Sequence, residues 1–218
     1  RMWALGKAIE AAGLEKSFFA YARVDSLLRD LDLMRYWRRL GLSRLFIGIE
    51  SAVDGELDAY GKRQKRDEIV RALGAARELG ISLFSNFIVD PGYTRRDFEE
   101  LVRFIEDNDV RYPAFTVLTP IPGSGVPFDA VVERQANGRP RWDLFDLQLA
   151  VTPTRMPPDE FAREYAELYR RFEPRYLSSG SELGLPSHRD RAEAQRAAWT
   201  RIALRVLGEA AAPTAGDG

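Results

Sequence analysis

The sequence predicts an α/β fold, in the form of a partial TIM-type (β/α) barrel with a mainly helical C-terminal extension. Apolar runs of strand length recur about 30 residues apart, which is the size of a βαβ unit. These runs are FFAYAR (18–23), LFIGIE (45–50), LFSNFIV (83–89) and AFTVLTP (114–120). They are nearly continuous in hydrophobicity, which is typical of parallel strands covered on both faces. Sequential parallel strands favour a barrel, although an open sheet remains an alternative.

Helical patterns fill the gaps between these runs. They cover DLDLMRYWRRLG (30–41), RDEIVRALGAARELG (66–80) and RRDFEELVRFIEDND (95–109). In the second segment, one face collects the apolar residues Ile69, Val70, Leu73, Ala76 and Leu79. Gly80 is a candidate C-cap, and Thr94 with Asp97 resembles a capping box before the third segment. Ser51 and Asp54 offer the same pattern before a short helix, DGELDAYGK.

The alternation of strands and helices ends after the fourth run. We expect four βα units in residues 1–125, and a loop-rich extension with an amphipathic helix in residues 126–177. Residues 178–218 are predicted to hold a linker, a second amphipathic helix over 192–210 and a disordered tail. The N-terminal stretch RMWALGKAIEAAGLEK also reads as an amphipathic helix rather than a signal peptide.

Composition excludes several classes of function. The 218 residues carry 32 basic and 33 acidic side chains, a balance that argues against a nucleic-acid-binding surface. No apolar run reaches the roughly 20 residues of a membrane helix, so we expect no transmembrane segment and a cytoplasmic protein. Cysteine is absent, and the one histidine, His188, stands in a polar loop. We therefore predict no metal site, disulfide or cysteine nucleophile within this chain.

Polar residues gather where the predicted strands end. Arg23 and Asp25 follow the first strand, and Glu50 and Ser51 the second; Ser85, Asn86 and Asp90 lie in and after the third, and Thr119 and PIPGS end the fourth. The carboxyl ends of parallel strands form one rim, where ligands bind. Glu50 is thus expected to face a site shared with Arg23 and Asn86. The alternatives are structural: Glu50 pairs with Arg23 or caps a helix, Asn86 satisfies a backbone group, and PGYT and PIPGS are ordinary turns.

The order of these motifs resembles a known family. RVDSLL, FIGIES, a following GK, NFIVDPGYTRRDFEELVRFI and LTPIPGS resemble the later half of radical S-adenosylmethionine (SAM) enzymes, most of all the subgroup with an N-terminal cobalamin-binding domain. WDLFDLQLAVTPTRMPPDEFAREYAELYRRF resembles the post-barrel extension of the hopanoid C-3 methylase type. The resemblance covers roughly residues 1–175.

The resemblance implies a SAM site at the rim. Glu50 would lie near the ribose hydroxyls, where a carboxylate is a bidentate acceptor. Arg23 would contact the SAM carboxylate or Glu50, and Lys62 or Arg63 is a weaker candidate for that carboxylate. The remaining cofactor-binding residues implied are Ser51, Asn86, Ile88 with Val89 on the apolar flank, and Ile121, Pro122 and Gly123 beside the adenine. No catalytic residue is identified.

The family also implies cofactors that this chain cannot hold by itself. Radical SAM enzymes bind a four-iron four-sulfur cluster through three cysteines after the first strand, and the subgroup uses cobalamin; this sequence has no cysteine and starts beyond the second strand. We therefore interpret it as a fragment, either a partial reading frame or a degenerate relative. Its partners would be the missing N-terminal half, a reductant for the cluster and a small-molecule or lipid-like substrate.

Several functions fit this resemblance. The first is a cobalamin-dependent C-methyltransferase acting on an apolar, polycyclic lipid-like substrate through a 5′-deoxyadenosyl radical, with Phe128, Trp142 and Phe145 walling the pocket. Those rings have the alternative role of packing the extension onto the barrel. The other functions are a different radical SAM chemistry (cyclisation, oxidation or methylthiolation) and a non-catalytic cysteine-free relative. An alternative outside the resemblance is an unrelated barrel enzyme such as an aldolase, which would require a lysine or an acid pair at the strand ends; the sequence shows neither arrangement clearly.

Overall fold

The computed structural model describes residues 1–51, 65–123, 127–132 and 134–179. The chain divides into two compact units, of which the first comprises residues 1–89 and 99–116 and the second residues 90–98 and 117–218. Several sequence predictions lie outside the described residues: the short helix after Ser51, Lys62 and Arg63, and the helix over 192–210 with its tail.

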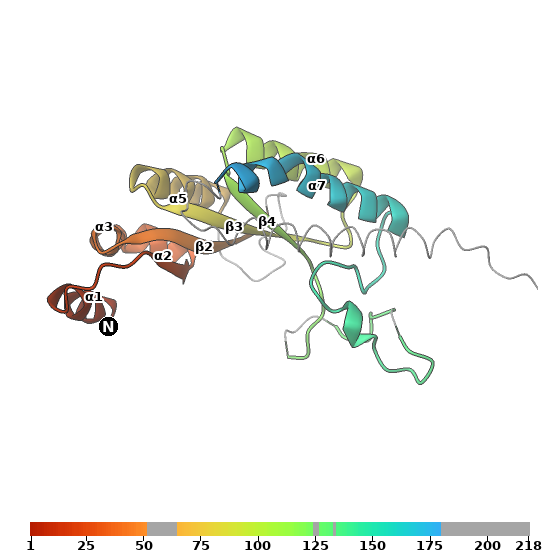
Figure 1. Cartoon of the computed structure of the whole chain (residues 1–218). Helices are drawn as coiled ribbons and strands as arrows, with labels where there is room; N and C mark the ends of the chain where they lie inside the picture. The colour runs from red at the N-terminus through yellow and green to blue at the C-terminus, as the bar shows by residue number, and fades with distance from the viewer. Residues whose placement is uncertain (52–64, 124–126, 133, 180–218) are drawn as a thin grey trace, which may run out of the picture. The chain divides into compact units, whose positions relative to one another are not determined.

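The first unit is built on a four-stranded sheet with the order β1-β2-β3-β4 (Figure 1). The strands are β1 Phe18–Ala22, β2 Leu42–Glu50, β3 Ser82–Val89 and β4 Tyr112–Val117. β1 pairs with β2, and β2 with β3, in parallel. The predicted sequential α/β sheet is confirmed. The fourth strand begins and ends earlier than the predicted 114–120.

Helices connect the strands, as predicted, and further helices precede the first strand and follow the fourth. They are α1 Met2–Ala11, α2 Val24–Arg29, α3 Leu31–Arg39, α5 Arg66–Glu78, α6 Arg95–Asp107 and α7 Pro158–Ser179, with a 3₁₀ turn η1 at Trp142–Leu144. The helix predicted over 30–41 is confirmed as α3, whereas α2, which starts at Val24 and is separated from α3 by a break at Asp30, was not predicted. Gly80 takes a φ of 67° after α5, as expected of a C-terminal glycine.

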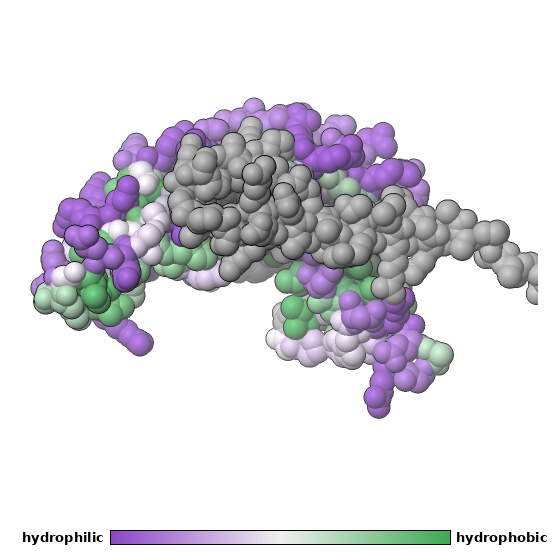
Figure 2. Space-filling model, viewed as in Figure 1, coloured by the Kyte–Doolittle hydropathy of each residue, from purple (hydrophilic) through white to green (hydrophobic). Residues whose placement is uncertain are grey.

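One face of the sheet carries the hydrophobic core of the first unit. Leu45, Ile47 and Ile49 of β2 alternate onto this face, and Phe87 of β3 packs between rings of α6 and β4. On α5, the buried stripe is Ile69, Ala72, Leu73 and Ala76. The prediction that Val70 shares that stripe is wrong: Val70 is exposed, because it follows Ile69 by one residue and so turns about 100° away from it. The outward surface of α6 is hydrophilic (Figure 2).

The opposite face of the sheet is open within the described residues. Phe19 and Tyr21 of β1 are 45% and 76% exposed, and they contact the half-buried rings of Phe84 and Phe46, respectively. We call this the open face. The expectation that every strand is covered on both faces is therefore wrong here, since aromatic residues that read as core in the sequence lie on an uncovered surface.

The second unit is organised around α7. Phe161 of α7 packs edge-on against Phe98 at 5.5 Å, and Arg95 forms an ion pair with Glu164 at 3.2 Å. Further along α7, Tyr165 donates a hydrogen bond of 2.7 Å to the Gln148 side-chain oxygen, and burial raises the pKa of this tyrosine well above its usual 10. α7 is therefore held by an aromatic contact and an ion pair to the start of α6, and by a hydrogen bond to the loop at Gln148.

Candidate functional site at the end of the parallel sheet

A β-bulge shapes the end of β2. Gly48 lies opposite Asn86, but the next paired residue, Glu50, lies opposite Phe87, so β2 contains one residue more than β3 over this step. Glu50 has a φ of 71°, in the left-handed region that non-glycine residues rarely occupy. Bulges and such backbone outliers concentrate at functional sites, where they re-aim a side chain.

Glu50 is the accessible residue at this strand end. Ile49 before it and Ser51 after it are both fully buried, whereas Glu50 is half-buried. Ser51 donates its backbone N–H to the Ile49 carbonyl oxygen at 3.0 Å, which closes a tight turn around Glu50. The structure therefore offers the Glu50 carboxylate to the rim, and Ser51 contributes to the turn from a buried position.

Asn86 lies beside the bulge and has a defined partner. Its Nδ2 donates a hydrogen bond of 3.3 Å to Thr116 Oγ1 on β4. Asn86, Ile88 and Thr116 are half-buried, while the residues that alternate with them, Phe87 and Val117, are buried. With its amide nitrogen engaged by Thr116, Asn86 retains the side-chain oxygen as an acceptor.

Arg23 does not pair with Glu50 in this structure. Its Nε donates a hydrogen bond of 3.0 Å to Asp25, two residues along the chain, and the Arg23 side chain is 73% exposed. This hydrogen bond lowers the pKa of Asp25 and raises that of Arg23. Asp25 also accepts the backbone N–H of Ser26 at 2.8 Å, in the first turn of α2. The structural alternative of a Glu50–Arg23 ion pair is therefore wrong, since a local partner occupies the guanidinium.

Three other rim residues lie elsewhere than expected. Ser85 and Val89 alternate onto the buried face, so Ser85 does not face the rim and Val89 does not share the half-open side with Ile88. Thr119 is buried, and its hydroxyl donates to the Val117 carbonyl oxygen at 3.0 Å. In each case strand parity or a local backbone bond takes the side chain away from the expected site.

The turn at residues 121–123 belongs to the second unit. Ile121 is half exposed, and Gly123 takes a φ of 86° that an L-residue adopts only with strain. The approach of Ile121, Pro122 and Gly123 to an adenine stays a prediction. The same holds for the rings of Phe128, Trp142 and Phe145, which form a mutual cluster with centroids 4.9–6.0 Å apart.

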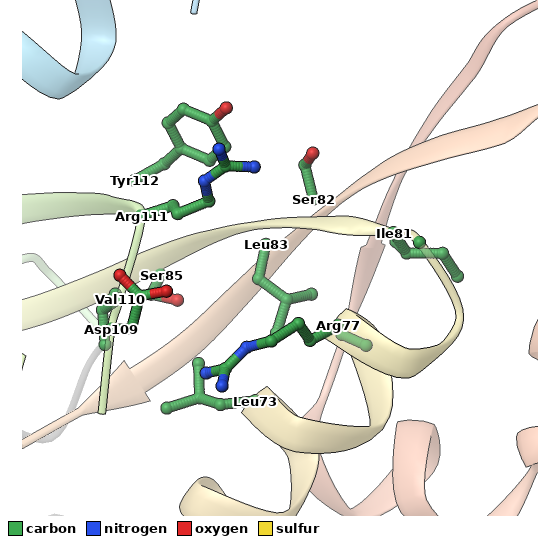
Figure 3. Close-up of a pocket in the computed structure, with 12 residues that line it drawn as sticks. Leu73, Arg77, Ile81, Ser82, Leu83, Ser85, Asp109, Val110, Arg111 and Tyr112 are labelled. Atoms are coloured by element: carbon green, nitrogen blue, oxygen red, sulfur yellow. The ribbon is translucent and has the colours of Figure 1, made fainter. Parts of the chain in front are cut away.

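A cavity of about 180 Å³ opens at the other end of the sheet (Figure 3). Its lining includes Ile81 and Ser82 at the start of β3, Arg111 and Tyr112 at the start of β4, and Arg77 of α5. Ligands of α/β folds bind at the carboxyl ends of the strands, so this cavity does not coincide with the candidate site.

Among the described residues, no group of three histidine or acidic side chains is arranged to hold a metal ion. The helices of these described residues are all too short or too polar to span a lipid bilayer.

Residues 6–105 match the sequence model of the radical SAM superfamily. These residues form part of a radical SAM domain. It is 35% identical over 167 residues to the hopanoid C-3 methylase of Methylococcus capsulatus, which is 76% of this chain and 31% of that protein. It is 30% identical over 87 residues to the bacteriochlorophyllide d C-8(2)-methyltransferase of Chlorobaculum tepidum, covering 38% of this chain and 19% of that protein.

Solved structures agree on the fold. The apo form of the cobalamin-dependent S-adenosylmethionine radical enzyme OxsB superposes with a TM-score of 0.54 at 16% identity, over 92% of this chain and 39% of that chain. Coproporphyrinogen III oxidase (HemN) from Escherichia coli superposes with a TM-score of 0.51 at 13% identity, over 79% of this chain and 37% of that chain. At this identity the likeness shows the fold alone. The chain thus has the α/β architecture of radical SAM enzymes and spans about a third or less of the curated relatives named above.

The family cluster does not fit this chain by itself. The sequence contains no cysteine, and thiolates are the ligands that hold iron–sulfur clusters. Sequence reasoning also missed two features of the site, namely Thr116 as the partner of Asn86 and the bulge before Glu50. Gly48, which interrupts an apolar run just before the carboxylate, is the one signal that could have indicated the bulge.

Proposed function

We propose that this chain is part of a radical SAM C-methyltransferase, and that the end of its sheet supplies one side of the SAM site. The observation that carries this proposal is the left-handed Glu50 at a bulge beside the Asn86–Thr116 pair. This arrangement offers acceptor oxygens from two adjacent strands at the end where the fold binds ligands. Superfamily membership supports SAM as the ligand.

Each acceptor has a task in this proposal. The two oxygens of Glu50 accept hydrogen bonds from the vicinal hydroxyls of the ribose, a bidentate arrangement that a carboxylamide cannot reproduce. Asn86 accepts a hydrogen bond from the adenosine, and the Ile88 side chain packs against the apolar side of the adenosine. Arg23, exposed and anchored by Asp25, is available to the methionine carboxylate of SAM. Ile121, Pro122 and Gly123 approach the adenine through the backbone.

The substrate is proposed to be a large apolar molecule with several fused rings. The two curated relatives described above are named for methylating a hopanoid and a bacteriochlorophyllide, which share that character. Phe128, Trp142 and Phe145, whose rings cluster in the second unit, provide apolar surface for such a substrate. The thiolates of the cluster, the cobalamin-binding domain and the contact for the reductant belong to parts of the polypeptide outside these residues.

A second candidate is a cysteine-free relative that binds a nucleoside ligand without radical chemistry. Such a relative would need no cluster ligand, and these residues contain none. Cyclisation, oxidation and methylthiolation on the same fold are further alternatives; the methyltransferase is put first because a methylase is 35% identical over 167 residues of this chain.

Equilibrium dialysis of the 218-residue chain against radiolabelled SAM tests the proposed site. We expect the chain to bind SAM and adenosine to displace it. Displacement by 2′-deoxyadenosine should require a concentration at least ten-fold higher. Glu50→Gln should lower SAM affinity about ten-fold, in line with the loss of one charge-assisted hydrogen bond. Asp32→Asn is the matched control, since Asp32 is an exposed carboxylate of α3 that pairs with Arg35. Equal affinity in Glu50→Gln and wild type would refute the role of Glu50.

A further inference from the structure

A buried hydroxyl without a partner lies in the cavity at the start of β3 and β4. Ser85 is fully buried, and its Oγ forms no hydrogen bond within the part of the chain that the structure describes. It lines the cavity of about 180 Å³, all of whose lining residues belong to the first unit (Figure 3). Because buried hydroxyls are ordinarily hydrogen-bonded, Ser85 indicates that this cavity holds a polar occupant.

Two side chains of opposite charge line the same cavity without pairing with each other. The Asp109 carboxylate forms no hydrogen bond or ion pair with any residue in the described part of the chain. Arg77 of α5 donates one hydrogen bond of 3.0 Å, from Nη2 to the Asn108 carbonyl oxygen. Its Nη1 and Nε have no acceptor among the same residues. The cavity therefore presents one free carboxylate and two free guanidinium donors.

The backbone holds this carboxylate in place. Asp109 has a φ of 46°, in the left-handed region that aspartate and asparagine tolerate better than most residues. Its N–H donates to the Glu106 carbonyl oxygen at 3.1 Å, and Asn108 Nδ2 donates to the Phe104 carbonyl oxygen at 2.9 Å. With the Arg77 bond, these contacts fix the turn after α6. The charged groups are thus positioned before any ligand binds, which lowers the cost of binding.

The walls and the volume limit what the cavity can hold. Leu73 of α5, Leu83 of β3 and Val110 line it with buried apolar side chains. A cavity of about 150 Å³ accommodates a molecule the size of benzene, so this one has room for a ligand of about six or seven non-hydrogen atoms. The lining therefore fits a small molecule that carries a positive group, a negative group and a short side chain.

We propose that this cavity binds a small zwitterionic amino acid with a hydroxyl group, of the size of serine. The ligand carboxylate accepts hydrogen bonds from Arg77, its ammonium donates to Asp109, and its hydroxyl bonds to Ser85. A simple anion would leave Asp109 unpaired and a simple amine would leave Arg77 unpaired, whereas a zwitterion compensates both charges. The site lies at the opposite end of the sheet from Glu50, and this inference does not rest on the proposed function.

Isothermal titration calorimetry of the 218-residue chain with L-serine tests the site. We expect saturable binding of L-serine, about ten-fold weaker binding of L-alanine, and none of propionate or ethylamine at the same concentrations. Asp109→Asn should weaken L-serine binding at least ten-fold, because asparagine keeps the left-handed backbone but loses the charge. Asp107→Asn is the matched control, since Asp107 is an exposed carboxylate of α6 outside the cavity lining, and it should retain the affinity.

Ser85→Ala tests the buried hydroxyl, and this variant should bind L-serine and L-alanine equally. Four results would overturn the inference. They are no saturable binding of either amino acid, which would mean an occupant of ordered water only; equal binding of both by the unchanged chain; binding of propionate or ethylamine as tight as that of L-serine; and displacement of SAM by L-serine in dialysis. SAM binding is measured separately at the other end of the sheet, so failure of this inference is distinguishable from failure of the proposed function.

Discussion

The Glu50→Gly variant should have a higher free energy of unfolding than the Glu50→Ala variant, even though Glu50 ends a β-strand. The φ of 71° costs an L-residue about 1–2 kcal/mol, while glycine loses about 0.5–1 kcal/mol more conformational freedom on folding. The difference favours Glu50→Gly over Glu50→Ala by about 0.5–1 kcal/mol. Because both variants delete the same carboxylate, their comparison isolates the backbone from the side-chain contacts of Glu50.

Urea denaturation of the 218-residue chain measures this difference. With a slope of about 2 kcal/mol per M, the Gly variant should unfold at a urea concentration about 0.25–0.5 M higher than the Ala variant. The same pair at Glu99, an exposed position within α6, should show the opposite order by about 1 kcal/mol, since glycine is unfavourable in a helix. An Ala variant at position 50 that is as stable as the Gly variant would refute the left-handed conformation and the bulge built on it.

Three further outcomes follow from other parts of the structure. Phe87→Ala should destabilise the chain by about 3–5 kcal/mol in urea unfolding, because Phe87 is fully buried between two rings; a cost below about 1 kcal/mol would contradict this packing. Thr116→Val should weaken SAM binding in dialysis and Thr116→Ser should retain it, since only the hydroxyl orients Asn86; equal loss in both would show a packing role instead. The raised pKa of buried Tyr165 favours its neutral form in the folded chain, so stability is retained below about pH 10 and lost as the pH rises further. Tyr165→Phe should flatten this alkaline loss of stability in urea unfolding at a series of pH values, and an unchanged profile would exclude Tyr165 as its source.

The fold followed from the sequence because its signals are local and periodic. Apolar runs at regular spacing indicated a parallel sheet, and the stripe of Ile69, Leu73 and Ala76 indicated a helix packed on it. The short helix α2 was not predicted, because its six residues make fewer than two turns and contain only two buried apolar residues, Val24 and Leu27, which is too little for a periodic pattern.

The site was only partly predictable because it depends on pairing between strands. Glu50 and Asn86 could be placed at one rim from the order of the strands, but the extra residue before Glu50 exists only relative to β3. Ser85 was misplaced because one residue of register decides which face a side chain joins. The expectation that Arg23 lies with Glu50 failed because Asp25, only two residues along the chain, binds the guanidinium instead.

The most direct test of the account is the sequence of the DNA upstream of the codon for Arg1, read in the same frame. If this chain is part of a radical SAM methyltransferase, the frame continues and encodes Cys-x-x-x-Cys-x-x-Cys about two strands before residue 1, preceded by a cobalamin-type domain. A start codon with no cysteine motif between it and Arg1 would contradict radical chemistry. Glu50 and Asn86 would then be ligand-binding residues of a cysteine-free relative.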